Sequence, residues 1–151
     1  MLVRRAEVPA SSLIARYLSD PASHVDAYVT TGDATLEQFV RVFFSTPTFR
    51  SERHLLGLGG KVSSDQQVDD LASGVGSAMA AWVVEDRNET ELLLTVPGSP
   101  IRTWLAVGRA ELWFGSAIVA EGGKVPFLAK ALMPFHHVYS RTLLRAAANR
   151  V

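Results

Sequence analysis

The strongest constraint on the fold is a change of hydrophobic period near Ala78. From there to Val119, apolar and polar side chains alternate in four stretches that short polar turns separate. Alternation at a period of two is typical of strands with one buried face, and turns this short join antiparallel neighbours. The pattern therefore predicts an antiparallel meander. Its four stretches are 80–84, 92–96, 101–107 and 110–119.

The other face of these predicted strands is also partly apolar, since it carries Val83, Leu93, Trp104, Trp113 and Val119. An antiparallel sheet commonly leaves one face in water, so a second apolar face indicates a further cover. We expect a partner subunit or a long helix to provide that cover.

A long amphipathic helix is predicted after the meander, from Pro126 to about Asn149. Its apolar residues recur at spacings of three and four through the whole stretch. Pro134 lies inside it, and a proline in a helix interior removes a hydrogen bond. The sequence therefore predicts a kink or a break near residues 131–133.

Shorter elements are predicted before the meander. Residues 24–30 alternate as a strand, with Val25, Ala27 and Val29 on one face. An apolar stripe over residues 36–44 predicts a helix, and Thr35 and Gln38 match a capping box. A second short helix is expected from about Pro47 to Leu56, ended by Gly57. Segment 61–77 is interpreted as a loop beside a pocket mouth.

Composition limits the class of protein. The 151 residues fit one domain, 1–151, and 48% apolar with 20% charged residues excludes wholesale disorder. Fifteen basic against fifteen acidic residues argues against a nucleic-acid or membrane-surface partner. The absence of cysteine excludes disulfides and thiolate chemistry. We find no secretory signal and no apolar run of about 18 residues, so a cytoplasmic location is expected.

The order of elements predicts an α+β helix-grip fold, in which a curved antiparallel sheet wraps around a long C-terminal helix and two short helices follow the first strand. Three motifs carry a family resemblance: His-Val-Asp-Ala-Tyr at 24–28, Phe-Phe-Ser-Thr-Pro at 43–47 and Pro-Phe-His-His-Val-Tyr at 134–139. With them the sequence resembles the START/polyketide-cyclase (SRPBCC) superfamily, and most closely a bacterial domain-of-unknown-function branch of it. The resemblance implies an apolar ligand held between sheet and last helix. It implies no particular reaction and no cofactor, because the superfamily contains carriers, cyclases and hydratases.

His136 and His137 are the most conspicuous candidates for chemistry. Neighbouring helix positions point about 100° apart, so a regular helix cannot direct both rings to one metal ion. No paired-histidine or His-Glu-x-x-His spacing occurs, and we expect no metal site. Two interpretations stay open. One ring packs on the sheet while the other is solvated, or one ring titrates at a cavity wall and works with Tyr139 as an acid–base pair.

Aromatic residues of the strands and the last helix are candidates for a ligand wall, with ordinary packing as the alternative. Arg102 shares strand parity with Trp104. It would bind a ligand carboxylate if that face lines a cavity, and it would pair with Glu111 across the strands if the face is solvated. The predicted ligand-binding set is Trp82, Arg102, Trp104, Trp113, Phe135 and Tyr139.

Three functions are therefore compatible with the sequence. The first is binding of a small apolar molecule between the sheet and the C-terminal helix. The second is a cyclase-like or hydratase-like enzyme that uses His136 or His137 with Tyr139. The third is a homodimeric interaction module that uses the second apolar face of the sheet.

Overall fold

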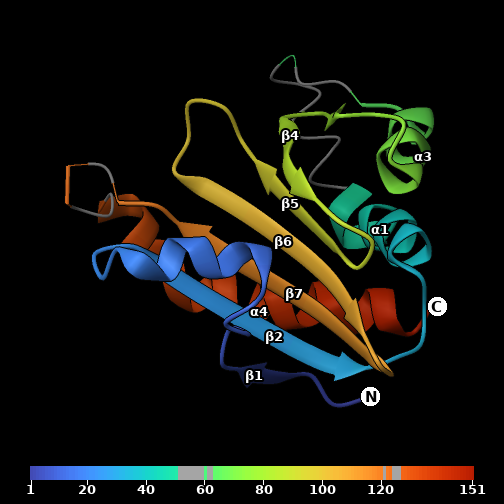
Figure 1. Ribbon diagram of the computed structural model, residues 1–151, viewed down its shortest axis with the longest axis horizontal. Coiled ribbons are helices and arrows are strands. Elements are labelled where there is room, and N and C mark those ends of the chain that lie inside the picture. Colours follow the sequence, from blue (N-terminus) through green and yellow to red (C-terminus); the bar gives the residue numbers. More distant parts are fainter. Residues whose placement is uncertain (51–59, 61–62, 121, 124–126) are drawn as a thin grey trace.

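A computed structural model describes residues 1–50, 60, 63–120, 122–123 and 127–151, with residues 128–133 described by their backbone alone. The chain is α+β, and its strands form one seven-stranded antiparallel sheet in the order β1-β2-β7-β6-β5-β4-β3 (Figure 1). The elements are β1 (Arg4–Ala6), η1 (a 3₁₀ helix, Leu13–Ser19), β2 (His24–Thr31), α1 (Leu36–Phe44), α3 (Asp65–Ser73), β3 (Ala78–Met79), β4 (Trp82–Arg87), β5 (Glu91–Thr95), β6 (Ile101–Gly108), β7 (Glu111–Ile118) and α4 (Phe127–Ala148).

The predicted meander is confirmed as β4, β5, β6 and β7, each paired antiparallel with the next. Beyond β7 the sheet continues with β2, a pairing that local sequence patterns do not specify. The first long strand, β2, pairs with the last one, β7, from His24 opposite Ile118 to Thr31 opposite Glu111. Residues 24–28 therefore lie beside residues 114–118, although most of the chain separates them in sequence.

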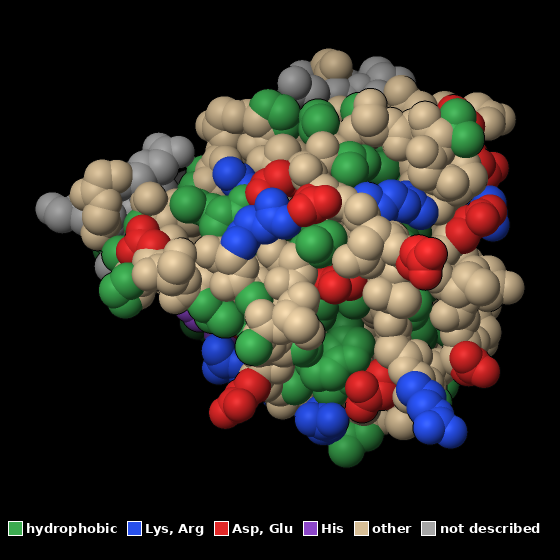
Figure 2. Space-filling model, viewed as in Figure 1, with side chains coloured by type: hydrophobic (Ala, Val, Ile, Leu, Met, Phe, Trp, Pro, Cys, Tyr) green, Lys and Arg blue, Asp and Glu red, His purple; other side chains and the backbone are tan. Residues whose placement is uncertain are grey.

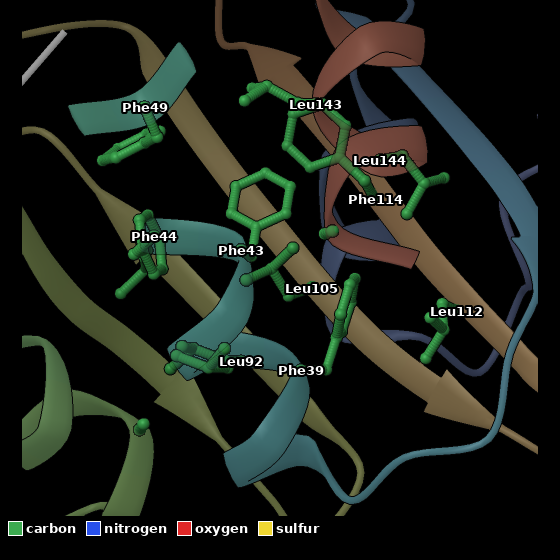
Figure 3. Close-up of a cluster of buried hydrophobic side chains, with 14 of the residues drawn as sticks. Phe39, Phe43, Phe44, Phe49, Leu92, Leu105, Leu112, Phe114, Leu143 and Leu144 are labelled. Atoms are coloured by element: carbon green, nitrogen blue, oxygen red, sulfur yellow. The ribbon is translucent and has the colours of Figure 1, made fainter. Parts of the chain in front are cut away.

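One face of the sheet carries the main core. Helices α1 and α4 pack against each other, and α4 also packs on β2 and β7. Phe39 and Phe43 of α1 point toward Leu105 and Phe114 of the sheet, next to the leucines of α4 (Figure 3). The predicted capping box of Thr35 and Gln38 is present and fixes the start of α1. The strict apolar stripe of α1 thus supplies the aromatic centre of this core.

The second apolar face of the sheet is covered in part from within the chain, by the 3₁₀ helix η1 and not by a long helix. Figure 1 shows η1 in front of β2 and β7, with α4 behind them. Ile14 of η1 is fully buried in a second cluster with Leu93 and Trp104. The approach is close, because a Cβ added to Gly115 would lie 2.8 Å from the Trp104 ring and 3.4 Å from Ile14.

Two further expectations need correction. Segment 61–77 was predicted to be a loop, but it contains α3, which begins with a second capping box at Ser64 and ends at Gly74 in the left-handed conformation. Helix α4 is continuous through Pro134, so the predicted break does not occur. Residues 47–50 are helical as expected, and the rest of that predicted helix lies outside the described residues.

Candidate functional site

A buried carboxylate, Asp26, lies on the α4-facing side of the sheet. Side chains alternate along a strand, so His24, Asp26 and Tyr28 of β2 all point to this side. The Asp26 side chain has no exposed surface. Because burying an unpaired carboxylate is very costly, the groups around Asp26 must compensate its charge.

Ser116 provides the first compensating contact. It lies opposite Asp26 in the β2–β7 register, and its Oγ is 2.7 Å from Asp26 Oδ1. The same Oγ is 2.6 Å from His136 Nε2. An ionised carboxylate only accepts hydrogen bonds, so Ser116 donates to Asp26 and accepts from the Nε2–H of His136. His136 is thereby tied to Asp26 through one hydroxyl.

Tyr28 and His137 compensate the other carboxylate oxygen. The Tyr28 hydroxyl contacts His137 Nδ1 and lies 3.5 Å from Asp26 Oδ2. His137 Nδ1 itself is 3.4 Å from Oδ2. Burial and the neighbouring Asp26 charge raise the pKa of Tyr28 to about 12, so its hydroxyl stays protonated. Adjacent histidines of α4 therefore reach the two oxygens of one carboxylate.

His24 and Ser140 complete the group. His24 Nε2 lies 3.7 Å from Asp26 Oδ2, is buried, and has no hydrogen-bond partner. Ser140 Oγ is 3.4 Å from His136 Nε2, one helical turn along α4. We refer to these residues as the Asp26 cluster, which consists of His24, Asp26, Tyr28, Ser116, His136, His137 and Ser140.

The surroundings of Asp26 favour its ionised form. Burial opposes ionisation of Asp26, but the His136 imidazole 3.7 Å from Oδ1 and the hydrogen bond from Ser116 outweigh it and place its pKa below the usual value. Burial lowers the pKa of His137 by more than Asp26 raises it. His137 is therefore uncharged at neutral pH. The side chains of His136 and His137 are 29% and 34% exposed, so the imidazoles are reachable while the carboxylate is sealed.

A groove of about 550 Å³ lies at the edge of the sheet, and Asp26 is the one residue of the Asp26 cluster in its lining, although its side chain has no exposed surface. It forms where β1 stops pairing with β2, and Arg5, Leu18 and Asp26 belong to its lining. The positive charge of Arg5 acts on both Tyr28 and His137. In contrast, the C-terminal half of α4 is packed tightly on the sheet, since Leu143 and Leu144 are at most 1% exposed. The expected cavity therefore does not extend under that half of the helix.

The predicted ligand-wall residues do not form one site. Trp82 is buried in the main core against Phe49, and Tyr139 is half-buried against the same core. Phe135 is 74% exposed. Trp104 and Trp113 belong to the second cluster under η1, and the strand register puts them on the face of the sheet opposite to Asp26 and Ser116.

Hydrogen bonds explain the positions of these two tryptophans. Trp104 Nε1 donates to Glu91 Oε2 at 2.7 Å, and the same oxygen accepts from the backbone N–H of Leu13. Trp113 Nε1 donates to Glu111 at 3.2 Å. Both rings line a smaller groove of about 310 Å³ beside the N-terminal segment. The hydrogen bond of Trp104 to Glu91 therefore helps to attach η1 to the sheet.

Arg102 also has a structural partner. Its Nε is 2.7 Å from Glu85 and 2.9 Å from the Tyr17 hydroxyl, and its guanidinium lies over the Tyr17 ring. The expected pair with Glu111 is wrong, because Glu111 lies opposite Gly108 in the sheet register.

Figure 2 shows basic and acidic side chains interleaved on this face of the molecule, and almost no histidine is visible from this side.

Sequence reasoning missed most of the cluster. His136 and His137 were singled out, but Asp26, Tyr28 and Ser116 were not given a role. The available sign was the alternation of β2, which puts residues 24, 26 and 28 on one face. The interpretation in which one histidine packs on the sheet and the other is solvated does not hold, because both contact groups of β2 or β7.

The described residues offer neither a metal site nor a helix that could span a membrane. They contain no group of three or more histidines and acidic residues arranged to hold a metal ion. None of their helices combines the length and hydrophobicity that crossing a membrane requires. Comparisons of the chain with protein-family models, with curated proteins and with solved structures found no match.

Proposed function

We propose that the protein has the helix-grip fold and binds a small molecule whose polar group contacts the Asp26 cluster. The fold proposal is supported by the sheet order, in which the first long strand joins the last strand of the meander, and by α4 lying across these two strands. Two of the three motifs that carry the SRPBCC resemblance, residues 24–28 and 134–139, supply most of the cluster.

The observation that carries the proposal is the buried Asp26 with two imidazoles bound to it through hydroxyl groups. Replacing a buried ionic network by well-packed apolar residues is often neutral or stabilising, so such a network is weak support for stability. Its partly exposed members are His24, His136 and His137, and the Nε2 of His24 is buried, so His136 and His137 are the better candidates for ligand contact. The cluster is therefore better explained by binding than by folding.

The apolar part of the ligand has a surface available beside the cluster. Phe135 precedes His136 on α4 and exposes most of its ring. The groove at the sheet edge is lined in part by Leu18 and Val25, which lie on the η1 side, so Phe135 is the apolar surface beside the imidazoles. A ligand with one polar group and an apolar body would bury apolar area on Phe135 while its polar group meets an imidazole.

A second candidate function is acid–base catalysis of the cyclase or hydratase type. The specific observation in its favour is the uncharged His137, which contacts the Tyr28 hydroxyl and the Asp26 carboxylate. A neutral imidazole oriented by a carboxylate is a typical general base. In this proposal Tyr28 takes the part that the sequence had suggested for Tyr139.

The homodimer hypothesis loses its original argument. It relied on an uncovered second face of the sheet, and η1 covers part of that face with Ile14. Among the described residues, no other observation favours a second copy over a small molecule.

Thermal shift with a compound panel tests the binding proposal. The probes are substituted phenols, medium-chain fatty alcohols and flat polycyclic aromatics, read by the melting temperature and by the histidine NMR signals. We expect at least one probe to raise the melting temperature and to move the signals of His136 and His137. His137→Ala should abolish the response, while Trp113→Phe, a matched control on the other face of the sheet, should keep it. A panel that moves neither readout rejects the proposal.

Hydrogen–deuterium exchange tests the enzyme candidate. Weakly acidic carbon acids such as aryl ketones are incubated with the protein in heavy water, and loss of the C–H signal is followed by NMR. Catalysed exchange that disappears in His137→Ala supports a base at this position. Exchange that is unchanged in both His136→Ala and His137→Ala removes these residues from any mechanism.

A further inference from the structure

The position of the proton on each imidazole follows from the Asp26 cluster. For His136, the Ser116 hydroxyl donates its only proton to Asp26, so its oxygen must receive one from Nε2. Ser140 Oγ is the second oxygen within reach of the same nitrogen, at 3.4 Å. A neutral His136 then carries its proton on Nε2, and Nδ1 is the bare nitrogen.

For His137 the nitrogen that faces the cluster is Nδ1, whereas for His136 it is Nε2. Its Nδ1 faces two oxygens, the Tyr28 hydroxyl and Asp26 Oδ2 at 3.4 Å. A bare Nδ1 would direct its lone pair at a carboxylate, which is repulsive, whereas Nδ1–H is attracted to both oxygens. The neutral ring therefore carries its proton on Nδ1, and Nε2 is left as the acceptor.

The charged groups around His136 and His137 also disfavour an anionic ligand. Asp26 and His24 face the two imidazoles from β2, Arg5 faces them from β1, and Arg141 lies on α4. Both arginines are exposed, so solvent screens their effect on a ligand. The buried Asp26 carboxylate is screened much less. A second anion next to the imidazoles would meet this negative charge, and it would find bare acceptor nitrogens where it needs donors.

We propose, on the basis of the proposed function, that Asp26 holds both imidazoles with their N–H groups directed inward through Ser116 and Tyr28, and that the site therefore takes a ligand with a neutral O–H donor, such as a phenol or an enol, in preference to a carboxylate. Asp26, Ser116 and Tyr28 are positioning residues in this arrangement. The ligand hydroxyl donates to His136 Nδ1 or to His137 Nε2.

The first arm of the test reads the tautomers without any ligand. Nitrogen-15 NMR of the histidine rings, recorded above their pKa values, should give His136 as the Nε2–H form and His137 as the Nδ1–H form. Ser116→Ala should mix the tautomers of His136 alone, and Tyr28→Phe those of His137 alone. Trp113→Phe should change neither ring. The opposite tautomer at either wild-type ring overturns the proposal.

The second arm compares phenol with benzoate, which share a ring and differ in the polar group. Phenol should bind about tenfold more tightly than benzoate at neutral pH, and Ser116→Ala and Tyr28→Phe should reduce that preference. Equal or stronger benzoate binding overturns the ligand class while leaving the proposed binding function intact. Silence from both probes, and from the whole panel above, overturns the binding function as well.

Discussion

Asp26 and Ser116 face each other across the pairing of β2 with β7, and the Ser116 hydroxyl donates to Asp26 Oδ1 at 2.7 Å. This bond joins the first long strand to the last one beneath α4. It also fixes the oxygen that receives the His136 proton. The same cross-strand pair therefore links β2 to β7 and positions His136 in the candidate site.

Removing the Asp26 carboxylate should destabilise the fold. Asp26→Ala leaves the Ser116 and Tyr28 hydroxyls and the buried His24 Nε2 without their anionic neighbour. We expect a loss of about 2 kcal/mol in the free energy of unfolding, measured by urea denaturation. Asp33→Ala, which removes an exposed carboxylate, should have almost no effect. A loss of equal size in both variants would contradict a special role for Asp26.

The free energy of unfolding should fall with decreasing pH in two steps. The folded pKa of His137 lies below its ordinary value of 6.5, so the unfolded chain binds that proton first and stability drops as pH decreases below 6.5. The folded pKa of Asp26 lies below 3.8, so a further loss begins near that pH and continues down to the folded pKa.

Chemical denaturation across this pH range measures both steps. His137→Gln should lack the upper step and keep the lower one, because glutamine does not titrate. An unchanged upper step in this variant would assign that step to another group.

Gly115 should not tolerate a side chain. A Cβ at this position would lie 2.8 Å from the Trp104 ring and 2.9 Å from the backbone oxygen of Asp26. Gly115→Ala is therefore expected to lower the free energy of unfolding by about 1–3 kcal/mol through overpacking. Gly108→Ala is the matched control, because its nearest contacts would be ordinary ones at 3.7 Å. Similar melting temperatures for the two variants would contradict the close packing under η1.

Shortening Ile14 should uncover the second face of the sheet. Its side chain is fully buried against Trp104. Ile14→Ala should cost about 2–5 kcal/mol and should shift tryptophan fluorescence to longer wavelength as water reaches the ring. Leu18→Ala, on the same 3₁₀ helix but 49% exposed in the native protein, should do neither. No spectral change in Ile14→Ala would mean that another segment covers Trp104.

The elements that sequence periodicity predicted correctly are those whose pattern is local and strong. The stripe of α1, the alternation of β4–β7 and the rhythm of α4 each follow from which side chains must be buried within one element. The missed elements are η1, α3 and the short strands β1 and β3. Helix α3 buries only Val68, Leu71 and Ala72, which is too small a stripe to separate from a loop. An element could therefore be predicted where its own apolar residues formed a strong local pattern.

The sequence by itself determined the secondary structure of the meander and the two amphipathic helices, because those patterns depend on neighbours along the chain. It also determined that His24, Asp26 and Tyr28 share one face of a strand. Only the tertiary structure decided that this face meets Ser116 and the two histidines of α4, and that Trp104 lies under η1 instead. The physical reason is that strand pairing and helix docking join residues far apart in sequence, and the period within each element carries no information about its partner.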